Sequence, residues 1–187
     1  MLRLVRVDNA RVVTVTGPPG VGKRRFVDEV ASELRADERV ELAAAERPRG
    51  VPGESVYRLR PLAEAPAVEL FRQRAEAVDP EFDAPYTDVA RVCRRIGRLP
   101  LAVELAAARS AAALAELADR RWSLPEVVAW TCDRLGPRER EVLRLAAIEP
   151  AAVKAEDAVA LEALNLVERT KTGVATHPAI RRIAASL

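Results

Sequence analysis

The chain has 187 residues, of which 49% are hydrophobic and 4% aromatic, and its formal net charge is +2. This length supports one or two small cores, and the scarcity of aromatic residues favours helices rich in alanine and leucine. The nearly balanced charge gives no sign of a polyanionic partner. No stretch approaches the roughly 20 apolar residues of a membrane span, and the alternating start predicts no signal peptide. We therefore expect a cytoplasmic protein without a membrane partner.

The first third of the sequence has the pattern of a small sheet interrupted by one helix. Its apolar runs are short, and they either alternate with charged residues or are rich in valine, as strands are. A helix is expected from about Lys23 to Arg35, where apolar residues recur at helical spacing. Loops rich in glycine and proline separate these segments. The expected strands are 2–7, 11–16, 39–45 and 55–60.

The remainder of the sequence is helical apart from one short hairpin. Gly97 is placed to end one helix in the left-handed conformation, and Ser123 and Glu126 have the spacing of a capping box. Residues 166–170 and 173–176 are expected to pair as a small wing. The expected helices are 67–78, 88–96, 99–113 with 114–120 continuing or following it, 124–135, 138–148, 156–164 and 179–187.

These elements predict an α/β plus α fold class. The small parallel sheet, of three to four strands with helices, is of the phosphate-loop type, and a helical bundle and a winged-helix domain follow it. We place the domains at 1–64, 65–122 and 123–187.

The loop after strand 11–16 matches the phosphate-binding pattern GxxxxGK[ST] at every position except the last. Glycine permits the backbone angles that point successive N–H groups at an anion, and the following helix directs its positive end at the same place. Lys23 can reach the β- and γ-phosphates of a nucleotide. The expected phosphate-binding residues are Gly17, Pro18, Pro19, Gly20, Val21, Gly22, Lys23, Arg24 and Arg25.

The last position of the pattern holds Arg24 where a hydroxyl would bind Mg²⁺. A guanidinium has no lone pair for a metal and repels a cation. The pattern therefore predicts phosphate binding with little or no metal-dependent hydrolysis. A plain glycine-rich turn between strand and helix is the alternative interpretation. Lysine otherwise occurs only at Lys154 and Lys171, in a chain that uses arginine throughout, which favours a specialised role for Lys23.

Other residues offer little for metal or acid–base chemistry. Cys93 and Cys132 lie in helical patterns without metal-ligand spacing, which predicts reduced thiols. His177 is the only histidine, so a cluster of histidine ligands is excluded. We therefore name no catalytic residue and no metal ligand.

With these segments in order, the sequence resembles the nucleotide-binding module of STAND proteins. It looks most like the NB-ARC-type ATPase core of large bacterial transcriptional regulators of the LuxR and SARP kinds. Residues 13–25 resemble the Walker A strand and loop, and residues 41–61 resemble the sensor strand and the strand after it. Residues 93–109 are very close to the family's GLPLAxELAAAR motif, and residues 174–184 resemble the segment with the histidine of the MHD motif.

The resemblance implies that ATP or ADP is bound. It places Pro100 against the adenine and His177 at the β-phosphate. From the residues alone, His177 is equally well explained as the residue that opens a helix before Pro178. A nucleotide and a protein partner, or a second copy of the chain, are the partners that this family suggests.

One part of the family pattern is missing. The helix after the phosphate loop runs almost directly into the strand at 39–45, so the Walker B strand and its acids have no counterpart. Where the family has Thr-Ser-Arg after the sensor strand, this chain has Ala44-Ala45-Glu46. An alternative is that residues 40–46 are a shortened Walker B strand with Glu46 as the acid. Residues 2–7 are expected to cover the exposed sheet edge as an added strand.

The residues and the resemblance together suggest four functions, in descending order. The first is a nucleotide-binding signalling or regulatory module with little or no hydrolysis. The second is a pseudo-ATPase that binds no nucleotide and acts in interaction or assembly. The third is a winged-helix DNA-binding regulator, which ranks lower because the helix expected at 156–164 is acidic. The fourth is an active NTPase, which would need Glu46 or an acid from a partner.

Overall fold

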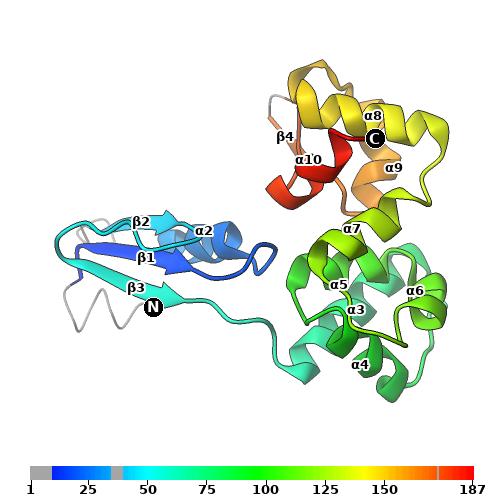
Figure 1. The fold of residues 1–187 in the computed structure, drawn as a ribbon, viewed down its shortest axis with the longest axis horizontal. Helices are drawn as coiled ribbons and strands as arrows, with labels where there is room; N and C mark the ends of the chain where they lie inside the picture. The colour runs from blue at the N-terminus through cyan, green and yellow to red at the C-terminus, as the bar shows by residue number, and fades with distance from the viewer. Residues whose placement is uncertain (1–9, 35–39, 172) are drawn as a thin grey trace. The chain divides into compact units, whose positions relative to one another are not determined.

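The computed structural model describes residues 10–34, 40–171 and 173–187, so the strand predicted at 2–7 lies outside the described residues. The chain forms two compact units, Met1–Pro61 and Leu62–Leu187, which we call unit 1 and unit 2 (Figure 1). The boundary expected after residue 122 stays a prediction.

Unit 1 is built on a parallel sheet of three strands in the order β2-β1-β3 among its described residues. The central strand β1 (Val12–Thr16) pairs with β2 (Glu41–Ala44) on one side and β3 (Glu54–Arg58) on the other. Val13 and Val15 of β1 are fully buried, as a central parallel strand requires. The prediction of a small parallel sheet is confirmed, with three described strands.

Helix α2 (Lys23–Glu33) packs against β1 and β2 of this sheet. Val30 is the buried residue of the helix, and the ring of Phe26 stacks on Tyr57 of β3, with 5.2 Å between the ring centroids. The helix is two residues shorter than expected because Leu34 turns into an extended conformation. The β1–α2 connection is therefore held between a buried strand and a helix anchored by an aromatic pair.

The described residues of unit 2 are helical except for one antiparallel hairpin, as predicted. Its first four helices are α3 (Glu64–Val78), α4 (Tyr86–Arg95), α5 (Pro100–Ala107) and α6 (Ser110–Glu116). The later elements are α7 (Leu124–Cys132), α8 (Pro137–Ile148), the 3₁₀ turn η1 (Pro150–Ala152), α9 (Ala155–Ala163), β4 (Glu168–Thr170), β5 (Gly173–Ala175) and α10 (Pro178–Ala184).

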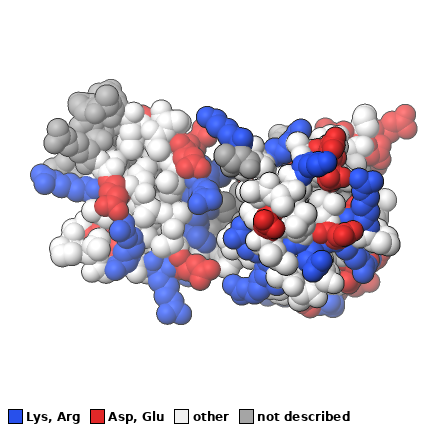
Figure 2. Space-filling view, turned by 90° about the horizontal axis from the view of Figure 1, so that it is seen from above, with Lys and Arg blue, Asp and Glu red and all other residues white. Residues whose placement is uncertain are grey.

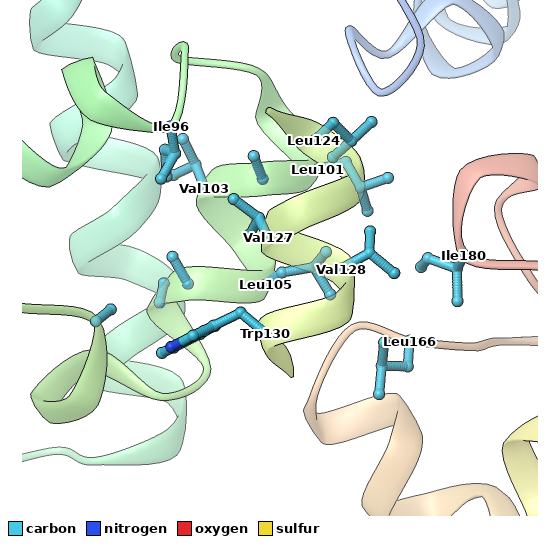
Figure 3. Close-up of a cluster of buried hydrophobic side chains, with 14 of the residues drawn as sticks. Ile96, Leu101, Val103, Leu105, Leu124, Val127, Val128, Trp130, Leu166 and Ile180 are labelled. Atoms are coloured by element: carbon cyan, nitrogen blue, oxygen red, sulfur yellow. The ribbon is translucent and has the colours of Figure 1, made fainter. Parts of the chain in front are cut away.

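A single apolar cluster runs through unit 2, with α5 near its centre. This helix packs against α3 and α7, and its alanine-rich sequence lets these neighbours approach closely. Figure 3 shows Leu105 of α5 beside Val127 and Val128 of α7, whereas Val103 of α5 lies beside Ile96. The same cluster includes residues from the hairpin and α10, so the core is continuous across residue 123.

Two local predictions about unit 2 have different outcomes. The capping box at α7 is confirmed, because Ser123 accepts from the Glu126 backbone N–H and the Glu126 carboxylate accepts from the Ser123 N–H at 2.7 Å. The single helix expected at 99–113 is wrong, because the chain breaks between α5 and α6. Arg109 has φ −135° at this break, and its guanidinium donates to the carbonyl oxygen of Arg134 at 3.1 Å. That distant acceptor cannot be read from an alanine-rich run.

Candidate phosphate-binding site

The phosphate loop begins where β1 ends, at a glycine that no other residue can replace without strain. Gly17 has φ +150°, and a Cβ built on it would lie 2.6 Å from the carbonyl oxygen of Leu59. Leu59 directly follows β3, and its N–H donates to the carbonyl oxygen of Thr16 at 2.8 Å. The start of the loop therefore packs closely against Leu59, the residue after β3. The sequence pattern did not predict this contact.

The middle of the loop is a turn that leads into the start of α2. Gly20 and Gly22 have φ values of +75° and +89°, in the left-handed region that favours glycine. Val21 is buried, and its N–H donates to the Pro18 carbonyl oxygen at 3.3 Å. Gly22 is the N-cap of α2 and supplies no side chain to cap it, so the first N–H groups of the helix have no side-chain acceptor there. This geometry suits an anion.

Lys23 lies across the loop at the first position of α2. Its ammonium donates to the carbonyl oxygens of Gly17 and Pro18, at 2.9 and 3.1 Å. An ammonium has three N–H donors, so one remains for a phosphate oxygen. Partial burial lowers the pKa of Lys23 below its ordinary value, and the negative charge of Glu46 opposes that shift. The loop and its lysine therefore fit a phosphate group.

Arg24 and Arg25 complete the first turn of α2, and both are exposed. Neither side chain forms a hydrogen bond or ion pair with another residue in the described part of the chain, whereas many arginines of unit 2 do. Three consecutive cations thus stand at the positive end of a helix dipole, which is unfavourable unless an anion is present.

The residues around the loop do not fit Mg²⁺. Arg24 occupies the position of the metal-binding hydroxyl, and a guanidinium has no lone pair to offer. Glu46 is exposed, follows β2, and is near enough to influence the pKa of Lys23. It is a single carboxylate, and the described residues contain no group of three acidic, histidine or cysteine side chains that could hold a metal. The alternative of Glu46 as a remaining catalytic acid stays open.

Pro100 and His177 belong to unit 2. Pro100 is the first residue of α5, and His177 is the N-cap of α10, where its Nδ1 accepts from the Ala179 N–H at 3.1 Å. His177 therefore opens a helix, as the local sequence predicted. Their contacts with adenine and phosphate stay predictions.

A carboxylate missed in the sequence holds the β2–β3 connection together. Glu54, the first residue of β3, accepts from the backbone N–H groups of Arg49 and Gly50, both at 2.8 Å. Arg49 in turn pairs with Glu41 at the start of β2. The sequence Gly-Val-Pro-Gly-Glu at 50–54 predicts a turn, but it does not show which groups the glutamate binds. This clamp fixes the two outer strands that flank the phosphate-loop strand.

The two cysteines have no part in the site. Both are free and buried, and burial raises the pKa of Cys93 to about 12 and that of Cys132 to about 11. Both thiols therefore stay protonated at neutral pH and are unreactive.

Comparisons with known proteins give partial relatives and a solved structure of similar fold. No protein-family model matches the chain. A 72-residue segment, 36% of the chain, is 42% identical to a putative HTH-type transcriptional regulator of Mycobacterium tuberculosis and spans 8% of that protein. A 66-residue segment is 44% identical to an uncharacterized protein of the same organism and spans 16% of it. The chain thus covers a small fraction of the curated relatives that it matches.

The fold of nearly the whole chain is similar to that of a solved signal-transduction ATPase. The crystal structure is of a STAND protein with a tetratricopeptide repeat sensor from Pyrococcus horikoshii, and the TM-score is 0.65. The match covers 98% of this chain and 41% of the other, with 12% sequence identity. At this identity the likeness shows the fold alone. No helix within the described ranges is long and apolar enough to cross a membrane.

Proposed function

We propose that the chain is a nucleotide-binding regulatory module of the STAND type that binds ADP or ATP and hydrolyses it little or not at all. The observation that carries the proposal is the loop from Gly17 to Lys23, with its left-handed glycines and a lysine that keeps one N–H available. The similarity to a signal-transduction ATPase supports the same interpretation of this loop. We also propose that the chain is related to regulators of the LuxR and SARP kinds. We propose that it is located in the cytoplasm.

Weak hydrolysis follows from the residues beside the loop. Phosphoryl transfer in P-loop enzymes depends on Mg²⁺ bridging the phosphates and on a group that positions the attacking water. Arg24 supplies no ligand for the metal, and Glu46 is the one acid that acts on Lys23 in the described residues. Without that machinery, the bound nucleotide would serve as a signal. We propose that Pro100 and His177 contact it from unit 2, so that it sets how the two units are arranged.

The test of nucleotide binding is isothermal titration of ADP and ATP into the full chain. We expect saturable binding that Lys23→Ala abolishes. Lys154→Ala is the matched control, because Lys154 is an exposed lysine at the start of α9 in unit 2. Phosphate release should not exceed that of Lys23→Ala. Failure of ADP and ATP to bind, or equal binding by Lys23→Ala, would contradict the proposal.

A second candidate is an interaction module that holds no nucleotide. The observation in its favour is that the Lys23 ammonium already donates to the loop's own carbonyl oxygens. In that case Arg24 and Arg25 serve a protein partner or a second copy of the chain. The same titration decides between the two candidates, because the second predicts no heat of binding for either nucleotide.

A third candidate is a DNA-binding regulator. The partial similarity to an HTH-type regulator favours it, as does the order of helices and hairpin from α7 to α10, which we propose is a winged helix. Against it, Glu156 and Asp157 lie in the first turn of α9, the helix before the hairpin. Figure 2 shows basic and acidic side chains interspersed on the visible face of the molecule. A salt-sensitive mobility shift on duplex DNA would raise its rank.

A further inference from the structure

We infer that the loop takes a nucleotide polyphosphate free of Mg²⁺, and that Arg24 stands in for the metal. This inference rests on the proposed nucleotide binding and adds the form of the ligand that binds. The fold and the residues of the loop disagree at one position. A phosphate loop of this type normally places a hydroxyl on Mg²⁺ directly after the lysine, and here that position carries a positive charge.

The start of α2 carries three positively charged side chains. Lys23, Arg24 and Arg25 occupy the first three positions of the helix, and its first turn contains no acid. Five helices of unit 2 do the opposite and carry an acid in the first turn, as the helix dipole favours. A bound anion would therefore stabilise the start of α2.

The three cationic side chains differ in the hydrogen bonds that they form. The Lys23 ammonium is fixed by two carbonyl oxygens of the loop, while the exposed Arg24 and Arg25 guanidinium groups have no partner among the described residues. A guanidinium presents paired N–H donors that match two phosphate oxygens, which a hydroxyl cannot do. Arg24 is thus able to neutralise the phosphate oxygens that Mg²⁺ would otherwise bridge.

The Arg24 guanidinium and Mg²⁺ would compete for the same phosphate oxygens. Glu46 lies close enough to Lys23 to act on its charge, but one exposed carboxylate does not balance three cations. A nucleotide that carries Mg²⁺ brings a divalent cation beside Arg24 and presents less negative charge to the loop. Free Mg²⁺ should therefore weaken binding, whereas a metal-binding phosphate loop is strengthened by it.

The experiment is calorimetric titration of ATP, ADP and inorganic pyrophosphate into the full chain, in EDTA and again in excess Mg²⁺. We expect binding in EDTA and at least about tenfold weaker ATP binding in excess Mg²⁺, a change of about 1.4 kcal/mol. Unchanged or tighter binding in Mg²⁺ would overturn the inference and leave nucleotide binding intact. No binding in either buffer would overturn both. Pyrophosphate binding separates recognition of the phosphates from recognition of the base.

Two variants test whether Arg24 is the residue that sets the effect of Mg²⁺ on ATP binding. Arg24→Ser restores the hydroxyl, so Mg²⁺ should now strengthen ATP binding, and Arg24→Lys keeps the charge, so Mg²⁺ should still weaken it. Arg25→Ser is the matched control, because it removes the neighbouring charge without restoring the hydroxyl and should keep the direction of the Mg²⁺ effect. If Mg²⁺ changes ATP binding in the same direction in Arg24→Ser and Arg24→Lys, Arg24 does not determine the response to the metal. If Arg24→Ser does not fold, the Arg24→Lys and Arg25→Ser titrations still decide, since tighter binding in Mg²⁺ for either contradicts the inference.

Discussion

The two units of the molecule are stabilised in different ways. Unit 2 has a continuous buried cluster that includes large side chains from most of its helices. The apolar side chains that the described residues of unit 1 bury are all small, and the threonines Thr14 and Thr16 are buried beside them. The apolar ones are Val13, Val15, Val21 and Val30. A sheet with so little buried surface gains less from the hydrophobic effect. Unit 1 is therefore the part whose stability should depend most on backbone geometry and on a bound anion.

The sequence provides a natural way to observe unit 2 alone. The chain has two tryptophans, Trp122 and Trp130, and both lie in unit 2. Tryptophan fluorescence therefore follows the unfolding of unit 2, while far-ultraviolet circular dichroism follows both units. The two signals together separate a loss of stability in unit 1 from one in unit 2.

The largest effect should come from the core of unit 2. Phe71 of α3 is fully buried and contacts Phe82, with 5.9 Å between ring centroids. Phe71→Ala should lower the free energy of unfolding by about 3–5 kcal/mol, because it removes apolar contacts and leaves a cavity. Urea titration followed by tryptophan fluorescence measures it. A change below about 1 kcal/mol would contradict the account of this core.

Gly17→Ala should have the next largest effect, and on unit 1. The new Cβ meets the Leu59 carbonyl oxygen at 2.6 Å, and the φ value of +150° is strained for alanine. We expect a loss of about 1–3 kcal/mol in unit 1 and loss of nucleotide binding, with the fluorescence transition of unit 2 unchanged.

The matched control for that change is Gly136→Ala in unit 2. Gly136 has φ −68°, and the nearest atom to an added Cβ is an oxygen of Glu139 at an ordinary 3.6 Å. It should therefore be tolerated. Equal effects of the two substitutions would show that the close approach at Gly17 does not matter.

A smaller effect is expected at the capping box of α7. Ser123→Ala removes the side chain that accepts from the Glu126 N–H. It should cost about 1 kcal/mol of unit 2 stability in urea titration. Ser110→Ala is the control, because Ser110 lies inside the first turn of α6 and does not cap it. A cost for Ser110→Ala as large as that for Ser123→Ala would contradict the capping role.

The smallest effect should be the pH dependence of the same box. The Ser123 backbone N–H and then Arg120 lower the pKa of Glu126 from 4.5 to about 2. Because the folded pKa is lower than the unfolded one, this contribution is present above the unfolded pKa of 4.5 and is lost as pH falls towards 2. Glu126→Gln should flatten that part of the fluorescence-detected stability profile. An identical stability profile for Glu126→Gln would show that Glu126 contributes nothing to the pH dependence of unit 2 stability.

The sequence predicted those features that depend on local residue types. Valine-rich strands, glycines before Lys23 and the Ser123 box each have a local cause, and the structure confirms the sheet and the cap. The break at Arg109 and the close approach of Leu59 to Gly17 depend on atoms distant in the chain. Neither can therefore be predicted from a local sequence pattern. The hydrogen bonds of Glu54 are local, since they join residues four and five positions apart, but the pattern of turn residues did not identify Glu54 as their acceptor. The roles of Pro100 and His177 at a nucleotide stay predictions.

Hydrogen exchange measured by mass spectrometry tests the central claim, that unit 1 holds a nucleotide phosphate in its loop, most directly. The experiment compares the full chain with and without ADP in EDTA, alongside Lys23→Ala. We predict slower exchange of the backbone N–H groups at residues 20–25 when ADP is added, and no change in the variant. Exchange in that segment that is unaffected by ADP, or equally slowed in Lys23→Ala, would contradict the account.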